Sequence, residues 1–373
     1  MFRQTSKVVL VLLLLGLLAA CVAPAATTAP AANQQSSSAA APAPASSDAA
    51  PAPASSDAVK LILGAYTTPR EAYAKLIPIF QAKWKADHNQ DVTFEESYLG
   101  SGAQSRAIVE GFEADIAALS LEADITRIEK AGLITHDWKS GASKGIVSTS
   151  VVVFAVRKGN PKGIKDWADL AKEGVEVLTP NPKTSGGAMW NILSLYGAAK
   201  RGFVEGVAKE DDAAAQAFLL SVLKNVTVMD KGARESITNF EQGVGDVAIT
   251  YENEALVAQK GGQDYEFVIP RSSILIENPV AVVDSYVDKH GTRAAAEAFV
   301  DFLFTKEAQT IFADYGLRSI DAEVAKATAA QYPALEDQFT IDYFGGWKEA
   351  TPTFFGDDGI YTKTVAQVQG LGE

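Results

Sequence analysis

The feature that most constrains this chain is a short strand that passes through a polar turn into a helix, at residues 175–196. Residues 175–178 form an apolar run of strand length, and the apolar side chains between residues 190 and 196 recur at helical spacing. The turn at residues 180–189 carries two prolines, two hydroxyl side chains and two glycines. This pattern predicts a buried strand that leads directly into the first turn of a helix.

The start of this predicted helix has the composition of an anion site. Thr184 or Ser185 stands where an N-cap hydroxyl belongs. The next residues, Gly186 and Gly187, leave their backbone N–H groups uncovered. Unpaired N–H donors at the positive end of the helix dipole suit an anion, and that geometry does not require the nearby Lys183. When this turn is taken alone, a capped helix with a flexible start is the simpler explanation, and only its recurrence elsewhere in the chain favours an anion site.

A similar helix start, with small hydroxyl or glycine residues, recurs at three more turns, each between a predicted strand and a predicted helix. These turns contain Thr67, Ser101 and the pair Gly232–Ala233. The order of elements in residues 60–133 is β-α-β-α-β, which implies a mainly parallel sheet with helices on both faces. In such sheets ligands gather at the carboxyl ends of the strands, which is where these turns lie. Four unrelated helix caps remain the alternative, since every α/β protein has capped helices.

Two long β-rich runs, residues 148–156 and 272–283, divide the predicted fold into two domains. The first run is a candidate crossover into a second domain, and the second could return the chain to the first. We therefore expect domain I to comprise residues 59–151 plus 272–373, and domain II to comprise residues 152–271. A crevice between the domains would bring all four turns together as an anion cage, built mainly from neutral donors.

Residues 1–20 predict a lipoprotein signal peptide rather than part of the fold. Arg3 and Lys7 form a positive region, and the apolar run at residues 8–18 is too short to span a membrane comfortably. The run ends in small residues before Cys21, a pattern that resembles the lipobox of bacterial lipoproteins and implies a lipid on the Cys21 thiol. Cys21 is the only cysteine of the chain, so the sequence excludes an intrachain disulfide.

Residues 22–58 are dominated by Ala, Pro, Ser and Thr and contain no aromatic residue. They therefore cannot bury enough apolar surface to fold. A nine-residue sequence occurs twice in succession there, at residues 41–49 and 50–58. We expect residues 21–58 to form a disordered, lipid-anchored tether that holds the folded part beside a membrane.

The charge of the chain excludes nucleic acid as a partner. The net charge is −13, and the four charges of residues 1–58 cancel, so the whole excess lies on residues 59–373. A nucleic-acid binder would be expected to carry the opposite sign. If the ligand is an anion, local donors rather than overall charge must hold it.

The motifs of residues 59–350 together resemble the sulfate- and thiosulfate-binding proteins that serve ABC importers and have the type II periplasmic-binding fold. The stretches that carry the resemblance are residues 157–161 (Arg-Lys-Gly-Asn-Pro), 180–188 (Pro-Asn-Pro-Lys-Thr-Ser-Gly-Gly-Ala), 232–234 (Gly-Ala-Arg), 245–247 (Gly-Asp-Val) and 252–254 (Glu-Asn-Glu). The resemblance implies an α/β fold of two domains, each a mainly parallel sheet flanked by helices, with the ligand in the cleft between them. It also implies a fully dehydrated oxyanion held by backbone N–H groups, serine hydroxyls and an indole N–H.

Carried onto this sequence residue by residue, the resemblance implies a set of ligand-binding residues. Its members are Thr67, Ser101, Ser185, Gly186, Gly187, Ala233 and Tyr251, with Arg234 in a supporting role. Thr67 stands where well-studied members have Asp, but the family uses the backbone N–H at that position. Tyr251 stands where they have Trp, and a phenol O–H donates with a different reach from an indole N–H. Met189 replaces an arginine, and residues 317–320 depart from the family's Arg-Pro ending.

We therefore expect an extracytoplasmic solute-binding lipoprotein, anchored to the membrane through Cys21. It would capture sulfate or thiosulfate and deliver the anion to the membrane permease of an ABC importer. We expect it to act as a monomer, with no cofactor and no metal. Molybdate, tungstate or another oxyanion is the alternative ligand, because the sequence does not distinguish among such anions.

A secreted serine hydrolase is the main alternative from another class, with Ser101 or Ser185 as the nucleophile. Neither serine lies in a Gly-x-Ser-x-Gly motif. A serine nucleophile also needs a nearby base, and His88, His136 and His290 stand in positions typical of the surface. The sequence has no Gly-Lys-Ser/Thr phosphate loop and no Cys/His metal spacing. A tethered adhesion module would not need four donor-rich turns. We therefore expect no enzymatic activity.

Overall fold

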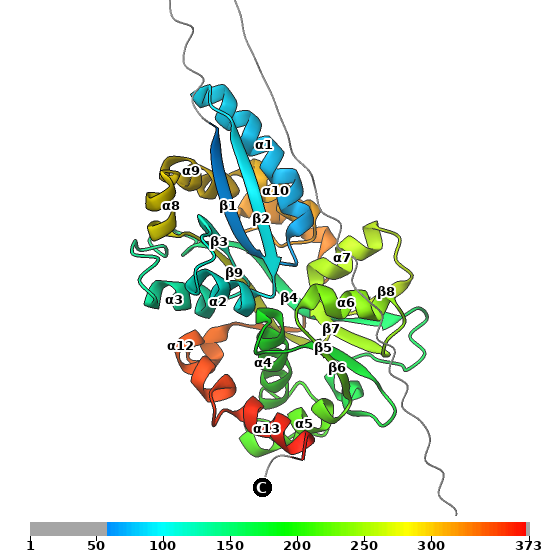
Figure 1. Ribbon diagram of the computed structural model, residues 1–373. Coiled ribbons are helices and arrows are strands. Elements are labelled where there is room, and N and C mark those ends of the chain that lie inside the picture. The colour runs from blue at the N-terminus through cyan, green and yellow to red at the C-terminus, as the bar shows by residue number, and fades with distance from the viewer. Residues whose placement is uncertain (1–57, 371–373) are drawn as a thin grey trace, which may run out of the picture. The chain divides into compact units, whose positions relative to one another are not determined.

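The computed structural model describes residues 58–370 (Figure 1). The predicted signal peptide, the Cys21 lipidation site and the tether up to residue 57 lie outside the described residues. Among the residues that are described, no helix is both long enough and apolar enough to cross a membrane.

The first part of the sheet is parallel, as the β-α-β order of the sequence predicts. β1 pairs with β2 on one side and with β3 on the other, so the carboxyl ends of all three strands point the same way. A helix follows each strand. These elements are β1 (Val59–Tyr66), α1 (Arg70–His88), β2 (Val92–Leu99), α2 (Ser101–Val109), β3 (Ile116–Ala118) and α3 (Glu122–Lys130).

Two long antiparallel strands, β4 (Ile146–Arg157) and β9 (Ser272–Val282), connect this part of the sheet to the next. β9 pairs with β3 through Val280–Val282 and with β4 through Leu275–Pro279. β4 in turn pairs with β7 through Val152–Val156. These are the two β-rich runs that the sequence predicted as crossovers, and each of them belongs to both parts of the sheet.

The second part of the sheet is again mainly parallel, because β5 pairs in parallel with both β6 and β7. Its elements are η1 (Trp167–Ala171), β5 (Val177–Pro180), α4 (Gly186–Lys200), α5 (Asp212–Lys224), β6 (Val226–Asp230), α6 (Ala233–Glu241), β7 (Val247–Tyr251), α7 (Glu252–Lys260) and β8 (Tyr265–Val268). The strand order over the described residues is β2-β1-β3-β9-β4-β7-β5-β6, with β10 beside β9 and β8 beside β4.

The remaining elements follow β9. They are α8 (Asp284–His290), α9 (Arg293–Leu303), α10 (Lys306–Asp314), α11 (Ala322–Thr328), η2 (Ala329–Gln331), β10 (Asp337–Phe339), η3 (Ile341–Phe344), α12 (Gly346–Ala350), η4 (Thr351–Phe355) and α13 (Ile360–Val368). Side chains of α9 and α10 share a hydrophobic core with α1 and β1. We call β1–β3 with α1–α3 and α8–α10 lobe 1, and β5–β7 with α4–α7 lobe 2.

The C-terminal segment packs on lobe 2. Phe339, Trp347, Phe354 and Tyr361 belong to the hydrophobic core that also contains the side chains of α4 and α5. The rings of Trp347 and Trp190 meet edge to face, with centroids 4.6 Å apart. The sequence placed residues 272–373 together in domain I, and it did not anticipate that the aromatic residues beyond 337 fill the core of the other lobe. The exact bounds of the two domains stay a prediction.

Candidate anion-binding site

The four donor-rich turns predicted from the sequence meet at one small cavity of about 10 Å³ between the two lobes. Its walls are formed by Tyr66, Thr67, Thr68, Gly100, Ser101, Ser120, Ser185, Gly187, Ala233 and Tyr251. Six of the seven residues predicted to bind the ligand are in this set. The seventh, Gly186, lies between two of them in the chain, and a Cβ atom built on it would be 2.8 Å from Ser120 Oγ.

Backbone N–H groups are the main donors that the turns supply. Ser185 is the N-cap of α4, and its Oγ accepts a hydrogen bond from the N–H of Ala188 at 3.3 Å. Gly186 and Gly187 are the first two residues of α4, and Ala233 is the first residue of α6. The first N–H groups of a helix have no acceptor within the helix. None of these three donates to another backbone group among residues 58–370.

Lobe 1 and lobe 2, which form opposite walls of the cavity, are in direct contact around it. The backbone N–H of Ala103 in α2 donates to the carbonyl of Thr184 at 3.0 Å. The indole N–H of Trp190 in α4 donates to the carbonyl of Ser120 at 2.9 Å. Gly100, just before α2, leaves no room for a side chain, because its Cβ would lie 2.6 Å from the carbonyl oxygen of Thr184. These contacts between lobes 1 and 2 explain why the cavity is so small.

Tyr251 forms part of the floor, and its hydroxyl already has a partner. The ring is 2% exposed, and Tyr251 Oη lies 2.6 Å from Ser120 Oγ. Burial raises the pKa of Tyr251 well above its usual value, so the phenol keeps its proton at neutral pH. Whichever of these two hydroxyls donates, the other keeps its proton free. The ring of Tyr66, across the cavity in lobe 1, has its centroid 6.2 Å from that of Tyr251, and its buried hydroxyl has no hydrogen-bond partner among the described residues.

Ser101 lines the cavity, but its hydroxyl is oriented by a residue that the sequence did not single out. Ser101 Oγ donates to Oδ2 of Asp124 at 2.6 Å and accepts from the N–H of Ser120 at 3.0 Å. Asp124 is 1% exposed, and its other oxygen, Oδ1, accepts from Nη1 of Arg127 at 2.6 Å. The sequence predicted Ser101 as a hydroxyl donor to the ligand. In the structure its proton lies on the bond to Asp124.

Arg234 does not line the cavity and instead links the two lobes beside it. Its Nη1 and Nη2 donate to the two carboxylate oxygens of Glu71 in α1, at 2.6 and 3.0 Å. Its Nε donates to Glu254 in α7 at 3.0 Å. Although burial opposes it, Arg234 holds the pKa of Glu71 below its usual value. Burial dominates at Glu254 and raises the pKa of that carboxyl despite the same arginine.

Sequence reasoning thus missed Tyr66, Ser120, Asp124 and Glu71. Ser120 follows directly after β3, so the rule that ligands gather at the carboxyl ends of parallel strands could have found it. No local sequence motif indicates Asp124 or Glu71. Each contacts a residue that only the fold brings near, Ser101 in the case of Asp124 and Arg234 in the case of Glu71.

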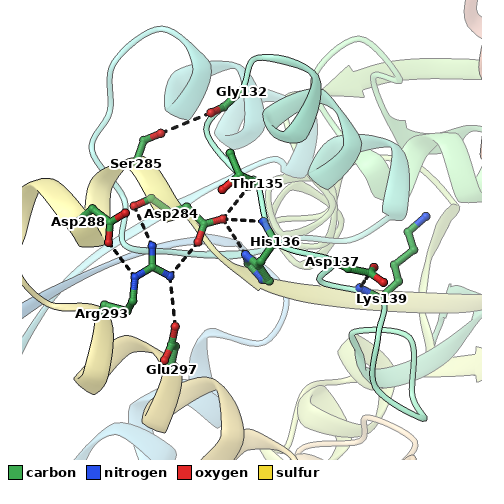
Figure 2. Close-up of polar contacts among 10 residues, drawn as sticks. All are labelled: Gly132, Thr135, His136, Asp137, Lys139, Asp284, Ser285, Asp288, Arg293 and Glu297. Atoms are coloured by element: carbon green, nitrogen blue, oxygen red, sulfur yellow. Dashed lines mark hydrogen bonds and ion pairs between the residues drawn. The ribbon is translucent and has the colours of Figure 1, made fainter.

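A larger cavity, of about 910 Å³, lies away from the predicted residues. Its walls include the loop at residues 136–145 and parts of β9 and α9. Figure 2 shows the polar cluster that holds this loop, centred on Asp284 at the start of α8. Oδ2 of Asp284 accepts from the backbone N–H of Thr135 at 2.7 Å and lies 2.7 Å from Nδ1 of His136. Arg293 Nη1 donates to Oδ1 at 2.8 Å, so the cluster has a structural explanation.

The described residues contain no group of three or more His, Cys, Asp or Glu side chains that could hold a metal ion. None of the residues that line the small cavity carries a charge. The chemistry that the cavity offers is therefore hydrogen bonding by backbone N–H groups and hydroxyls.

Comparisons with known proteins agree on one family. Residues 61–318 match the model of a family described as bacterial extracellular solute-binding protein. The chain is 46% identical to a sulfate-binding protein of Synechococcus elongatus over 84% of this chain and 88% of that protein. It is 39% identical to a thiosulfate-binding protein of Pseudomonas aeruginosa, over 80% of this chain and 89% of that protein. Among solved structures, the sulfate-binding protein SubI from Mycobacterium tuberculosis H37Rv matches with a TM-score of 0.74 and 38% identity, over 80% of this chain and 99% of that one.

Proposed function

Because the chain belongs to the bacterial extracellular solute-binding proteins, we propose that it captures sulfate or thiosulfate and delivers the anion to the permease of an ABC importer. The relatives named for these two anions support the choice of ligand. The observation that carries the proposal is the convergence of three helix starts and the Thr67 turn on one uncharged cavity.

The ligand-binding groups that we propose are neutral. They are the backbone N–H groups of Thr67, Gly186, Gly187 and Ala233, with the side chains of Ser101, Ser185 and Tyr251. Helix N-termini concentrate unpaired N–H groups and a positive partial charge, which together hold an anion without a cation. This mode of binding suits a protein whose folded part carries a net charge of −13. Arg234 supports the site from outside, as the link between α1, α6 and α7.

Sulfate fits such a site because each of its oxygens can only accept hydrogen bonds near neutral pH. Hydrogen phosphate keeps one proton, which needs an acceptor of its own. A buried polar group without a partner costs about 1–3 kcal/mol. We therefore expect the protein to bind sulfate more tightly than phosphate, because the cavity offers few hydrogen-bond acceptors for the proton of hydrogen phosphate.

The two lobes would close around the anion by a hinge motion. β4 and β9 are the strands shared by both parts of the sheet, so bending within them would move one lobe against the other. Two proposed domains, residues 59–151 plus 272–373 and residues 152–271, would meet at these strands, with the C-terminal aromatic segment packed on lobe 2. We propose that the protein acts as a monomer and has no enzymatic activity.

The folded part would work beside a membrane. We propose cleavage before Cys21, lipidation of its thiol, and a tether formed by residues 22–58. Such an anchor would keep the binding protein close to its permease outside the cytoplasm.

Calorimetry with the purified protein tests the proposal against sulfate, thiosulfate, molybdate and phosphate. Ser185→Ala removes the hydroxyl of a residue that is 3% exposed, and it should weaken sulfate binding. Lys183→Ala is the matched control two residues earlier, since its exposed ammonium can stay in water and should matter much less. Tighter binding of molybdate than of sulfate, or no binding of any of these anions, would refute the proposed ligand.

A further inference from the structure

A second cavity, of about 520 Å³, lies between the two lobes beside the anion cavity, and we call it the vestibule. Thr67, Arg70 and Tyr98 of lobe 1 line one side of it. Residues of lobe 2 between positions 229 and 239 form the other side. Thr67 lines both cavities, so the vestibule adjoins the proposed binding site directly. Several of its wall residues, Arg70 among them, are exposed, so the vestibule opens to solvent.

The lobes touch each other elsewhere around the anion cavity. The backbone N–H of Ala103 donates across the gap to the carbonyl of Thr184, and the indole N–H of Trp190 donates to the carbonyl of Ser120. These contacts leave no open passage where they occur. The vestibule, which both lobes line and which faces solvent, therefore offers an approach to the anion cavity.

Two cations of the vestibule have neither an ion pair nor a side-chain hydrogen bond among residues 58–370. Arg70 is the first residue of α1, and its guanidinium carbon lies 4.6 Å from the centroid of the Tyr98 ring. Lys231 lies in the turn before α6, on the other side of the vestibule. Its carbonyl accepts from Thr184 Oγ1 at 2.8 Å, which fixes the backbone, while the residue itself is exposed.

The other charges that line the vestibule are mostly held by neighbours. Arg234 is paired with two carboxylates, as described above. Asp230 accepts hydrogen bonds from side chains of α6 through both carboxylate oxygens, at 2.8 and 2.5 Å. Glu235 is exposed and has no partner among the described residues. Arg70 and Lys231 thus place a positive charge without a partner on each side of the vestibule, against one such carboxylate.

We propose that the vestibule is a transient binding site for the divalent oxyanion on its way to the anion cavity, and that Arg70 and Lys231 attract the anion there. The folded part carries a net charge of −13, which repels a dianion at long range. Cations at an entrance focus the local field and raise the rate of encounter. Neither residue lines the anion cavity, so both act on the anion as it enters or leaves. They set the rate of capture, and the neutral donors set the affinity. This inference rests on the proposed function.

The test is the kinetics of Arg70→Gln and Lys231→Gln with sulfate, or with thiosulfate if the protein binds that anion instead. Stopped-flow mixing follows tryptophan fluorescence, because Trp190 contacts the other lobe. At an ionic strength of about 0.01 M, each change should lower the association rate constant about threefold to tenfold, the effect of one cation roughly 6–12 Å from a dianion in water. The dissociation rate constant should fall with it, so the dissociation constant measured by calorimetry changes less than about twofold. The loss of rate should shrink at about 0.15 M, where the Debye length is about 8 Å.

Lys224→Gln is the matched control. Lys224 is the exposed last residue of α5, and it precedes β6, whereas Lys231 follows the same strand. The control removes the same charge from the opposite end of β6, away from the vestibule. It should leave both rate constants nearly unchanged. All three side chains are exposed, and thermal unfolding verifies that the variants are folded.

The outcomes separate this inference from the proposed function. An association rate constant that is unchanged in either folded variant overturns the inference while anion binding stands. An equal loss in Lys224→Gln would assign the effect to net charge and also overturn it. A lower association rate constant with an unchanged dissociation rate constant would place the cations beside the bound anion, which contradicts a transient site. If the unchanged protein binds neither sulfate nor thiosulfate, the proposed function and this inference fail together.

Discussion

Replacing Gly100 with alanine should weaken anion binding without unfolding the protein. Gly100 has φ −56° and ψ 138°, a backbone conformation that any L-residue adopts, so alanine is compatible with the local chain. Its Cβ, however, would lie 2.6 Å from the carbonyl oxygen of Thr184 and 2.8 Å from that of Lys231. Both are backbone atoms of lobe 2, which cannot move aside as a flexible side chain can.

The size of the effect follows from the distance by which the lobes must separate. Ordinary contact with a Cβ begins near 3.4 Å, so the wall formed by Thr184 must retreat by about 0.8 Å. Inserting a methyl group into a packed site costs about 1–3 kcal/mol. Because the clash lies between the lobes, this cost falls on the closed form rather than on the fold of either lobe. The dissociation constant for sulfate should therefore rise by about fivefold to a hundredfold.

Calorimetry gives the dissociation constant, and stopped-flow mixing should show that most of the change is faster release of the anion. Gly141→Ala is the matched control, because a Cβ at Gly141 has no neighbour within 4 Å and its φ is not in the left-handed region. Gly102→Ala should give an intermediate effect, since its Cβ would lie 3.3 Å from the carbonyl oxygen of Thr184. Sulfate affinity that is unchanged in a folded Gly100→Ala protein would show that the lobes do not meet at this residue when the anion is bound.

Three further predictions concern residues outside the cavity. Glu71→Gln removes the carboxylate in lobe 1 that pairs with Arg234 and leaves only the weaker bond to the Thr68 carbonyl at 3.3 Å, so sulfate should dissociate a few-fold faster in stopped-flow experiments. The pKa of Glu71 is lowered in the fold, so this link should be intact above the ordinary pKa of 4.5 and lost as the pH falls through the lower folded value. Asp284→Asn should cost about 1–3 kcal/mol of unfolding free energy at neutral pH and leave sulfate affinity unchanged. Partial burial raises the pKa of Asp284, but hydrogen bonds from the loop and from Arg293 outweigh it and hold this pKa well below its usual value (Figure 2). The difference in unfolding free energy between the unchanged protein and Asp284→Asn, measured with denaturant, should therefore shrink in strong acid. Cys21→Ala should move the protein from the membrane to the soluble fraction without loss of sulfate binding, and a variant that stays with the membrane would rule out the lipid anchor.

Much of the fold was predictable because its signals are local. The family and the two-domain α/β architecture predicted from the sequence are confirmed by the comparisons. Ser185 was predicted as a possible cap from its position before two glycines, and the structure shows it capping α4. The rule that ligands gather at the carboxyl ends of parallel strands then brought Thr67, Ser101 and Ala233 together, and all three line one cavity.

The remainder of the site depends on contacts between residues that are far apart in the sequence. Glu71 and Arg234 are separated by 163 positions, and only the folded chain brings the helices α1 and α6 together. The hydrogen bond from Ser101 Oγ to Asp124 likewise joins residues that are 23 positions apart, on helices α2 and α3. The position of the aromatic residues beyond 337 also depends on distant contacts. They pack on lobe 2 because its core accommodates them, as where the ring of Trp347 meets that of Trp190.

The distribution of charge around the cavity leads to a last prediction, on the effect of salt. The cavity walls carry no charged side chain, and buried carboxylates on the helices beside it are paired, Asp124 with Arg127 and Glu254 with Arg234. If an exposed cation held the bound anion, raising the ionic strength from about 0.01 to 0.15 M would shorten the Debye length from about 30 to 8 Å and weaken binding. Hydrogen bonds to buried N–H groups are screened much less, and screening the net charge of −13 would favour the approach of an anion. Sulfate affinity measured by calorimetry in sodium chloride should therefore stay constant or rise over this range. A tenfold loss of affinity would show that exposed cations, rather than the neutral donors of the helix starts, hold the anion.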